Sequence, residues 1–433
     1  MTPEEILDII IKAVAPGSLT ALRVGIIQET LDGKGYCQME EALHHSSTYI
    51  KDEGALTWGI ISKALGTKVT KLNLRDVVTQ YMHNLSTSSH PKYVDWGEAP
   101  DTSDFCGRTA QLATLMQWVE QDHCRLVAIA GMVGSGKTTL ATHFAKNLAD
   151  TGNFEVVVWR SLNQAPPYAD FIRELLDAIA PGQSPGLQPD AMMRLLLEDL
   201  RSHRCLLILD SVETVMQGGE LVGNYRPGYE DYALLWQHLG EVQHQSTILL
   251  TSREIPPEIA ILSESRALVR LQKLEPLSIE EGERILAVKR LLPAAQPQAQ
   301  GLIERYQGSP QMLLIAAMLS KKLSFNTDIL LPRDIRQLLA KQLNRLGNLE
   351  VRVMFCLNKH PQPITLAQLE TDLLPSISPV QLQDALVSLD RRSLVDTVNP
   401  PSAQPSRLRN LDCLSYTLQP VVREYIQQGL LHQ

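Results

Sequence analysis

The spacing of apolar side chains changes twice along this chain. Residues 1–84 carry apolar side chains at helical spacing, beginning with Ile6 and continuing one turn later. Residues 105–273 instead alternate short apolar runs with helical segments, which is typical of a parallel sheet covered by helices. Residues 274–433 return mainly to helical spacing. The pattern predicts a multidomain protein that is α/β in its middle and mostly α elsewhere.

The N-terminal region is expected to be a helical domain of the helix-turn-helix kind. Thr2, Pro3 and Glu5 form a capping box with proline in the first turn, so a helix begins almost at once. A polar turn, H-H-S-S, separates the last two of the helical patterns that follow. These further patterns cover about 18–31, 37–45 and 48–65.

The middle region contains near-continuous apolar runs, which suit strands that are buried on both faces of a sheet. The runs are LVAIAG (126–131), FEVVVWRS (154–161), CLLILD (205–210), STILLTS (246–252) and ALVRL (267–271). We therefore predict a sheet of five parallel strands with helices on both faces. The preceding segment, 85–104, is rich in Ser, Pro and acidic residues without apolar periodicity, and is predicted to be a linker.

Two smaller domains are expected after the sheet. Ser278 and Glu281 give a capping box at the start of a small helical domain, 274–344. Two capped helices near Thr365 and Ser378 then lead into SLVDTV, a polar Pro/Ser loop and LSYTLQP. Helices followed by a hairpin with a long loop predict a winged-helix domain over 345–433.

Composition narrows the class of protein. The chain has 433 residues, 20% charged side chains and a pI near 5.8, which gives no general attraction to nucleic acid or anionic membrane. The start of the sequence is acidic and no apolar run reaches the roughly 18 residues of a membrane helix, so we expect a cytoplasmic protein without a membrane partner. The six cysteines form no C-x-x-C pair and no His-coupled metal pattern, and are expected to be reduced thiols.

A phosphate-binding motif occupies the first strand–helix junction of the predicted sheet. Residues 131–138 read GMVGSGKT and match G-x-x-x-x-G-K-S/T between an apolar strand and a helical segment. The glycines allow backbone amides to converge on phosphate oxygens. Lys137 is expected to neutralise the β and γ phosphates, and the Thr138 hydroxyl to ligate Mg²⁺. The alternative is a glycine-rich turn without chemical function.

Two further side chains are candidates for the same site. Asp210 ends the strand CLLILD, where a P-loop protein places its second magnesium ligand, although a lone Asp after a strand is also a common turn residue. Arg253 follows the strand STILLTS at the expected carboxyl edge of the sheet, where it could sense the γ-phosphate. The alternative for Arg253 is a solvated surface arginine.

These motifs resemble the NB-ARC group of STAND signalling ATPases, and more closely its bacterial, especially cyanobacterial, members with a small helical domain in front. The resemblance covers nearly the whole chain and the motifs occur in the order expected for the group. They are FCGR (105–108), GMVGSGKTT (131–139), VVVWRSL (156–162), LLILDSVE (206–213), TSRE (251–254) and GSPQML (308–313).

The resemblance implies a role for each motif. Gly107 and Arg108 are implied to contact the base, Arg253 the γ-phosphate, and Pro310 the adenine ring. ADP would hold the domains in a closed form, and exchange for ATP would release them. The phosphates and Mg²⁺ would be held by Gly131, Met132, Val133, Gly134, Ser135, Gly136, Lys137, Thr138 and Thr139.

The sequence departs from the family pattern at two places. Ser211 follows Asp210, where members commonly have a second acid that polarises water, and the nearby Glu213 need not point at the site. We therefore expect at most a weak ATPase. Gln419 aligns with the histidine that touches the β-phosphate of ADP, and it can donate a hydrogen bond but carries no charge.

Three functions are compatible with the sequence. The favoured one is an ATP/ADP switch that acts through signalling protein partners and self-association into a homo-oligomer. The others are a nucleotide-controlled transcription regulator and a scaffold that holds ADP permanently. Acidic Asp52 and Glu53 near the start of the second helix of the helix-turn-helix oppose DNA, so nucleic acid is the less favoured partner. The long loop 217–232 is a candidate partner contact or a simple surface excursion.

Overall fold

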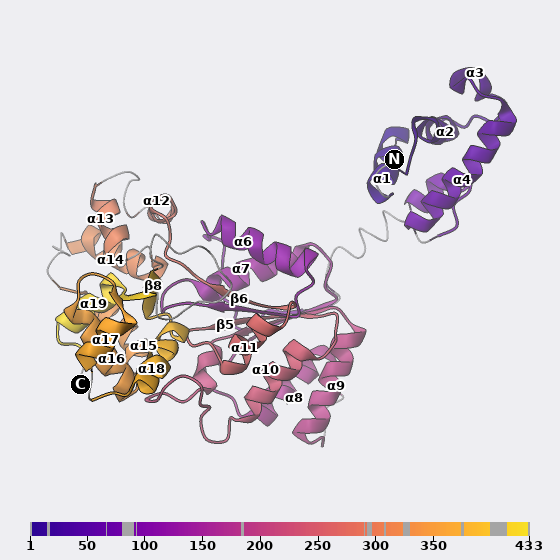
Figure 1. Cartoon of the computed structure of the whole chain (residues 1–433). Coiled ribbons are helices and arrows are strands. Elements are labelled where there is room, and N and C mark those ends of the chain that lie inside the picture. The colour runs from indigo at the N-terminus through magenta and orange to yellow at the C-terminus, as the bar shows by residue number, and fades with distance from the viewer. Residues whose placement is uncertain are drawn as a thin grey trace. The chain divides into compact units, whose positions relative to one another are not determined.

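The computed structural model divides the chain into two compact units, Met1–His90 and Pro91–Gln433, each described here by itself (Figure 1). The described residues are 2–14, 18–65, 67–79, 91, 93–182, 186–289, 291, 297–306, 309–323, 330–373, 376–398 and 414–431.

The first unit is helical, as the apolar spacing predicts. Its first helix begins with the predicted capping box, in which Thr2 and Glu5 each accept from the other's backbone amide. Ile10, Ile26 and Ile61 are fully buried where the helices meet. The helices are α1 (Pro3–Ala13), α2 (Ala21–Leu31), α3 (Glu40–Leu43) and α4 (Ser47–Leu65).

The second unit contains a parallel sheet with one strand more than predicted. Its strand order is β1-β3-β4-β5-β2-β6, and each pairing is parallel. The predicted count of five strands is therefore wrong. The strands are β1 (Tyr93–Asp95), β2 (Leu126–Ala130), β3 (Val156–Ser161), β4 (Cys205–Asp210), β5 (Thr247–Ser252) and β6 (Val269–Lys273).

The additional strand, β1, lies inside the segment predicted as a linker, which corrects that boundary. It is three residues long, sits at the sheet edge and pairs only with β3, with Tyr93 opposite Val156. Tyr93 and Val94 are exposed, so the strand has none of the apolar continuity that marks buried strands. Residues 85–90 and 92 of the predicted linker lie outside the described residues.

Helices cover both faces of the sheet, as predicted. Val127 and Ile129 of β2 are buried with residues of α6 and α7, whereas Leu126 and Ala128 are buried with residues of α8, α9, α10 and α11. Figure 1 shows α6 and α7 on one side of the strands and α8, α9, α10 and α11 on the other. In open sheets covered in this way, ligands bind outside the carboxyl ends of the strands. The covering helices are α6 (Thr109–Met116), which continues into a π-helical turn (Gln117–Gln121), α7 (Lys137–Asp150), α8 (Tyr168–Ile179), α9 (Pro189–Ser202), α10 (Asp231–Glu241) and α11 (Pro257–Ser265).

The C-terminal part is helical, with a small antiparallel sheet of order β7-β9-β8. The predicted hairpin is present as the antiparallel pair β8–β9, and its long Pro/Ser loop, 399–413, lies outside the described residues. The division of 105–433 into three domains stays a prediction. The elements are α12 (Ile279–Val288), α13 (Pro297–Arg305), α14 (Pro310–Leu323), α15 (Arg333–Leu343), α16 (Asn348–Lys359), β7 (Ile364–Thr365), α17 (Leu366–Leu373), α18 (Pro379–Arg391), β8 (Val395–Val398), β9 (Ser415–Leu418) and α19 (Pro420–Gln427).

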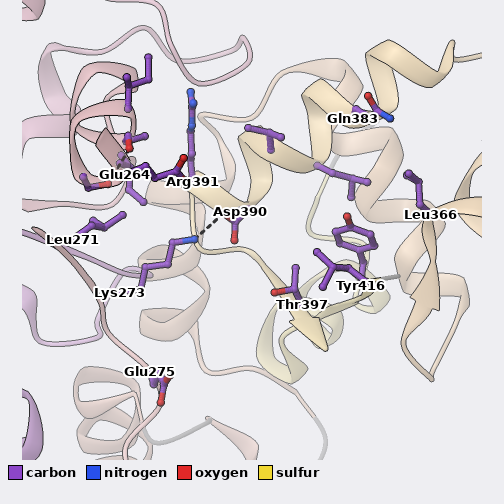
Figure 2. Close-up of a pocket in the computed structure, with 17 residues that line it drawn as sticks. Glu264, Leu271, Lys273, Glu275, Leu366, Gln383, Asp390, Arg391, Thr397 and Tyr416 are labelled. Atoms are coloured by element: carbon purple, nitrogen blue, oxygen red, sulfur yellow. Dashed lines mark hydrogen bonds and ion pairs between the residues drawn. The ribbon is translucent and has the colours of Figure 1, made fainter. Parts of the chain in front are cut away.

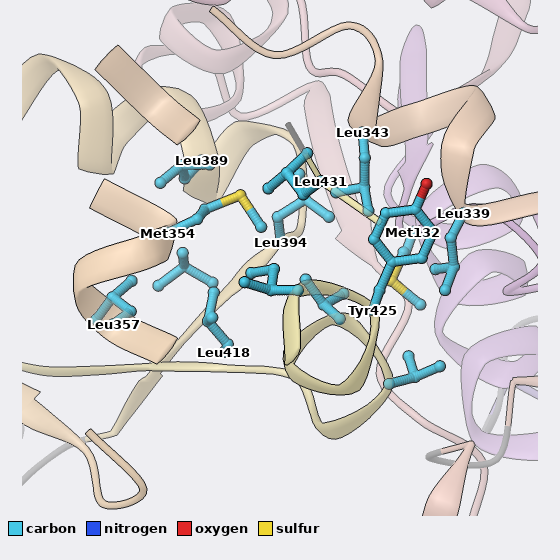
Figure 3. Packing of buried hydrophobic residues seen from close by; sticks show 14 of the residues in the cluster. Met132, Leu339, Leu343, Met354, Leu357, Leu389, Leu394, Leu418, Tyr425 and Leu431 are labelled. Carbon is cyan, nitrogen blue, oxygen red and sulfur yellow. The ribbon is translucent and has the colours of Figure 1, made fainter. Parts of the chain in front are cut away.

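The loop between β2 and α7 is packed into the C-terminal core. Met132 and Val133 of this loop are buried in the same apolar cluster as the helices α15, α16, α18 and α19. Figure 3 shows Met132 beside Leu339 and Leu343 of α15 and near Tyr425 of α19. Apolar contact therefore connects the first strand–helix junction of the sheet to helices that begin at Arg333 and extend to Gln427.

Two expectations from composition can be compared with the structure. Among the described residues, no helix combines the length and apolar character needed to cross a membrane. The described cysteines, Cys37, Cys106, Cys124, Cys205 and Cys356, are free thiols, and Cys413 lies outside the described residues.

Candidate functional site

The P-loop, residues 131–138, is the phosphate-binding motif and connects β2 to α7. Its glycines permit the backbone conformation that it adopts. Gly134 and Gly136 adopt φ values of 79° and 88°, a region that side chains with a Cβ rarely enter. Helix α7 begins at Lys137, so its first backbone amides have no acceptor within the helix and point toward the loop. The positive end of the helix dipole lies at the same place, which makes this junction suited to an anion.

Lys137 is a buried cation held by uncharged groups. Its Nζ donates to the carbonyl oxygens of Gly131 (2.9 Å) and Met132 (3.0 Å). Burial lowers the pKa of Lys137 to about 8, with Glu213 and Asp210 opposing this and Arg253 adding to it. Main-chain carbonyls offset only part of the desolvation of an ammonium group, so an incoming polyphosphate would find a strong electrostatic partner here.

Asp210 lies at the end of β4 beside Thr138 of α7. Its Oδ1 accepts from the Thr138 hydroxyl and from the Thr251 hydroxyl, each at 2.6 Å, and its Oδ2 accepts from the Ser211 hydroxyl at 3.0 Å. Burial raises the pKa of Asp210, and the three hydroxyl donors partly oppose that rise. The sequence predicted the pair of Thr138 and Asp210 but gave no role to Thr251.

The donor set fits a magnesium ion. A hydroxyl and a carboxylate are the oxygen ligands that Mg²⁺ takes in nucleotide sites, and two neighbouring ligands of an octahedral ion with bonds of 2.0–2.1 Å lie about 2.9 Å apart. The Thr138 and Asp210 oxygens are 2.6 Å apart, so a small outward movement of either would make them adjacent ligands of one ion. The residues present therefore fit both a polyphosphate and its cation.

Arg253 follows β5 and makes an ion pair with Glu213. The Arg253 Nε donates to Glu213 Oε1 at 2.6 Å and the Arg253 amide donates to Glu213 Oε2 at 3.0 Å. Burial acts to raise the pKa of Glu213, but Arg253 and Lys137 outweigh burial and lower it. Glu213 is thus a buried carboxylate within the electrostatic range of both predicted phosphate-binding cations.

A cavity of about 320 Å³ adjoins the P-loop, a size within the range of small-ligand sites. Its lining includes the predicted residues Arg108, Ser135, Gly136, Thr139 and Pro310. Pro310 begins α14 and brings the C-terminal half of the chain to the edge of this cavity. The remaining lining is Asp101, Thr102, Ser103, Asp104, Phe105, Cys106, Leu277, Ile285, Lys289 and Leu314.

Arg108 makes hydrogen bonds to the P-loop and to the segment that begins the C-terminal helices. Its amide donates to Glu281 Oε1 at 2.6 Å, and its guanidinium donates to the carbonyl oxygens of Glu275 (2.6 Å) and Ser135 (3.3 Å). Burial lowers the pKa of Arg108. The neighbouring Gly107 has a φ of 82°, and a Cβ there would contact Glu281 at 3.4 Å.

Gln419 lies apart from the main cavity. It lines a separate space of about 40 Å³ with Arg108, Met132 and Ser135, and its Nε2 lies 3.5 Å from Asp396 Oδ1. The structure therefore places Gln419 at the loop of the predicted phosphate site, but outside the 320 Å³ cavity.

The P-loop backbone is held by side chains that the sequence did not single out. The amide of Val133 donates to Gln342 Oε1 at 2.8 Å, and the carbonyl of Gly134 accepts from the Ser309 hydroxyl at 3.1 Å. Gln342 also donates to the carbonyl of Arg392 at 2.6 Å. A buried glutamine within an apolar helix face gives no motif, so Gln342 could be found only from the fold.

A buried charge cluster of Glu254, Arg345, Glu350 and Arg392 lies between the sheet and the C-terminal helices. Glu254 Oε1 accepts from Arg345 Nε and from Arg392 Nη1, each at 2.5 Å. Arg392 Nε in turn donates to Glu350 Oε1 at 2.8 Å. Arg345 Nη2 also donates to the carbonyl oxygen of Glu213 at 3.0 Å. The cluster therefore contacts the residue that holds Arg253.

A larger cavity, of about 760 Å³, lies elsewhere in the same unit (Figure 2). Residues of α11 and β6 line one side, residues of α18, β8 and β9 line the other, and Lys273 and Asp390 form a 2.7 Å ion pair within it. None of the predicted site residues, all of which are described, lines this cavity. Its size alone gives it no chemistry, so the smaller cavity beside the P-loop is the candidate site.

Comparison with known families agrees with this geometry. Residues 108–260, which begin at the buried arginine and include the P-loop, match the family model of the NB-ARC domain. This chain contains an NB-ARC domain. Residues 1–81 match the model of the vWA-MoxR associated protein N-terminal HTH. The resemblance drawn from the ordered motifs is thereby confirmed, and so is the helix-turn-helix assignment of the first unit.

Two relatives share more than the NB-ARC domain alone. An uncharacterized WD repeat-containing protein of Nostoc sp. is 37% identical over 397 residues, which cover 87% of this chain and 30% of that protein. Disease resistance protein RPM1 of Arabidopsis thaliana is 25% identical over 278 residues, covering 58% of this chain and 27% of that protein. The chain thus spans less than a third of the length of either relative.

A solved structure supports the fold of the NB-ARC domain and its surroundings. The Walker-type ATPase of Pyrococcus abyssi superposes with a TM-score of 0.51 at 14% identity, covering 76% of this chain and 99% of that one. At this identity the likeness shows the fold alone.

Proposed function

We propose that this protein is an adenine-nucleotide switch of the NB-ARC class, in which the bound nucleotide determines how the sheet and the C-terminal helices pack. The observation that carries the proposal is the position of Lys137. It is a buried cation whose hydrogen bonds go to uncharged groups, the carbonyl oxygens of Gly131 and Met132 and the Ser135 hydroxyl. It lies at the N-terminus of α7, beside a cavity lined by Arg108 and Pro310. ATP and ADP both present the polyphosphate and planar base that this arrangement would hold.

Each side of the site would bind a different part of the nucleotide. Gly131–Thr139 would surround the phosphates, with Lys137 neutralising their charge. Thr138 and Asp210 would hold Mg²⁺, which supplies charge neutralisation between the β and γ phosphates when bound. Arg108, Gly107 and Pro310 would contact the base side of the cavity. Gln419 would contribute a neutral hydrogen bond near the phosphates.

In this proposal, two sets of contacts couple nucleotide binding to the packing of the C-terminal helices on the sheet. Gln342 joins the P-loop amide of Val133 to the backbone of Arg392. Glu213 joins Arg253 to Arg345 of the buried charge cluster. A γ-phosphate that attracts Arg253 competes with Glu213 for the same guanidinium, so ATP and ADP would stabilise these contacts differently. The moving part would be the C-terminal segment 345–433, which we infer to be a winged-helix domain.

Hydrolysis is expected to be slow. A catalytic carboxylate must be able to orient a water molecule next to the γ-phosphate. Ser211 replaces the expected acid after Asp210, and the carboxylate of Glu213 is engaged by the amide and side chain of Arg253. Slow turnover suits a switch, because the ATP-bound form then lasts long enough to act on signalling partners or to self-associate.

The test begins with the full chain as purified. The retained nucleotide is identified after denaturation, and ATP and ADP are then titrated by calorimetry in the presence of Mg²⁺. Light scattering compares particle size with ADP and with a non-hydrolysable ATP analogue. We expect binding of both nucleotides and a size change with one of them. An absence of heat with both nucleotides would overturn the proposal, whereas an unchanged size would remove only the self-association.

A second candidate function follows from the N-terminal HTH match: nucleotide-controlled binding of DNA. Two features of the first unit oppose it. Glu53, near the start of α4, pairs with Arg23 at 3.0 Å, and the exposed Asp52 lies beside it. Duplex DNA retention that falls steeply with salt would favour this function. Retention that is weak at low salt and the same for ATP and ADP would leave a protein-binding role for the HTH unit.

A third candidate is a scaffold that holds ADP permanently. It predicts no phosphate release above that of a Lys137→Ala variant. Release that is measurable in the wild type and lost in Lys137→Ala excludes it, because only a working P-loop loses activity with its lysine.

A further inference from the structure

A group of metal-ligating side chains lies in the C-terminal helices, at the opposite end of α16 from the buried charge cluster. Cys356, His360 and Asp372 place a sulfur, a ring nitrogen and a carboxylate oxygen within 4.8 Å of one another. Cys356 lies in the last turn of α16, and His360 is the residue that follows the helix, in an extended conformation. Asp372 comes from α17, which packs beside α16.

The carboxylate of Asp372 lies close to both of the other ligand atoms. Asp372 Oδ2 lies 2.6 Å from His360 Nε2 and accepts from the Cys356 thiol at 3.7 Å. In a tetrahedral zinc site, bonds of 2.0–2.3 Å place neighbouring ligand atoms about 3.3–3.8 Å apart. The 3.7 Å separation falls within that range and the 2.6 Å separation is shorter, so a small outward rotation of the His360 or Asp372 side chain would bring the three atoms around one ion.

We propose that Cys356, His360 and Asp372 form a binding site for one zinc-class transition-metal ion. Sulfur and imidazole nitrogen select Zn²⁺ or Co²⁺ over Mg²⁺ and Ca²⁺, which take oxygen ligands. The sulfur is buried, whereas the His360 and Asp372 side chains are 35% and 38% exposed. An ion can therefore enter from the solvent side, and a water molecule completes the fourth position.

A nucleophilic cysteine is a poorer explanation of the same residues. In a Cys–His pair the imidazole contacts the thiol and the carboxylate orients the imidazole from behind. Here the carboxylate of Asp372 contacts both the thiol and the imidazole. This arrangement provides three ligands directed to one centre and no base dedicated to the sulfur.

The surrounding structure holds the ligands in place. Arg423 donates to the carbonyl oxygens of Leu357 (3.2 Å) and Asn358 (3.0 Å), which fixes the end of α16 between Cys356 and His360. An ion at this site would join α16 to α17 within the segment inferred to move in the nucleotide switch. The sequence did not indicate this group, because the third side chain comes from a different helix and only the fold brings it near.

The test uses the full chain after chelator treatment and dialysis. Co²⁺ is titrated and the thiolate-to-cobalt charge-transfer band is followed, with Zn²⁺ affinity measured by competition. We expect saturation at one ion per chain, displacement of Co²⁺ by Zn²⁺ and no competition from Mg²⁺. Cys356→Ser should abolish the band, and His360→Gln and Asp372→Asn should each weaken Zn²⁺ binding about tenfold or more. Cys37→Ser, which alters an exposed cysteine of the first unit, should leave the band unchanged.

Two results would overturn the site. One is a wild-type protein that gives no charge-transfer band, and the other is a band that persists unchanged in Cys356→Ser. If Cys356→Ser fails to fold, Asp372→Asn decides, since this partly exposed side chain can change without opening the core: unchanged Zn²⁺ affinity in that variant refutes the proposal. Nucleotide binding is measured on every variant, and its retention separates this result from the outcome of the switch proposal.

Discussion

Two buried cations in this protein differ in what neutralises them. Lys137 at the P-loop donates to main-chain carbonyls, whereas Arg392 in the buried charge cluster donates to the carboxylates of Glu254 and Glu350. A buried charge that is fully paired within the chain contributes to structure. A buried charge with only dipolar partners is poised for a ligand. The pairing of a buried cation thus distinguishes a structural cluster from a candidate binding site.

The largest effect is expected from breaking the paired cation. Arg392→Met leaves Glu254 and Glu350 buried with reduced compensation, which should lower the free energy of unfolding by about 3–5 kcal/mol. Denaturant unfolding of the full chain measures this loss. Arg391→Met is the matched control, because Arg391 borders the large cavity and is partly exposed, and it should change stability by about 0.5 kcal/mol or less. Equal losses in the two variants would contradict the assignment.

Removing the unpaired cation should have the opposite effect on the nucleotide-free protein. The pKa of Lys137 is about 8 in the folded chain against 10.5 unfolded, which costs about 3 kcal/mol at neutral pH. Because the unfolded chain binds more protons between these two values, this cost disappears as the pH rises from about 8 to 10.5. Lys137→Met should therefore be more stable than wild type by about 3 kcal/mol near pH 7, with the difference vanishing toward pH 10.5.

The same variant should lose nucleotide affinity by about a hundredfold or more, because the ammonium is the main phosphate partner in the proposed function. Calorimetry with ADP measures the affinity, and thermal unfolding across pH measures the stability. Lys341→Met, at an exposed position of α15, controls for the loss of a positive charge and should change neither quantity. A Lys137→Met protein that is less stable than wild type at every pH would show that carbonyl partners suffice for this cation.

A smaller effect should come from the magnesium side of the site. Asp210→Asn keeps an oxygen that can accept from Thr138 and Thr251 but removes the charge that an ion requires. The gain in nucleotide affinity on adding Mg²⁺ should be about tenfold to a hundredfold smaller in the variant than in the wild type. The variant should still fold. Titrations with and without Mg²⁺ measure the difference. Ser211→Ala, which removes a donor to Asp210 without removing a charge, should preserve most of the Mg²⁺ dependence.

The sequence predicted the P-loop, Asp210 and five of the six sheet strands because these features depend on local pattern. A buried parallel strand is a continuous apolar run, and the motif GMVGSGKT is contiguous. The edge strand β1 was missed because its three residues, of which Tyr93 and Val94 are exposed, carry no such pattern. Boundaries of the strands that were predicted differ by at most two residues from those observed.

The contacts that surround the site could not be predicted, because they join distant segments. Gln342 bonds to Val133 across 209 residues, and Arg392 bonds to Glu254 across 138. Each partner is unremarkable in its own helix or loop, and only the packing of the C-terminal helices on the sheet brings them together. The local sequence also could not show whether Arg253 is a solvated or a functional side chain, because its partner Glu213 lies 40 residues earlier in the chain.

The smallest effect, and the most specific one, concerns the competition for Arg253. Arg253→Gln should weaken binding of an ATP analogue about tenfold, or about 1.4 kcal/mol, and leave ADP affinity nearly unchanged, because only the γ-phosphate would draw on this guanidinium. Glu213→Gln should instead strengthen binding of the ATP analogue. The substitution removes the ion pair between residue 213 and Arg253, so the guanidinium can interact with the γ-phosphate. Paired titrations of both nucleotides against both variants measure the ratio. Variants that shift the ratio in the same direction would mean that Arg253 and Glu213 serve together as a structural ion pair, like Arg392 and Glu350, and that ATP is distinguished from ADP elsewhere in the site.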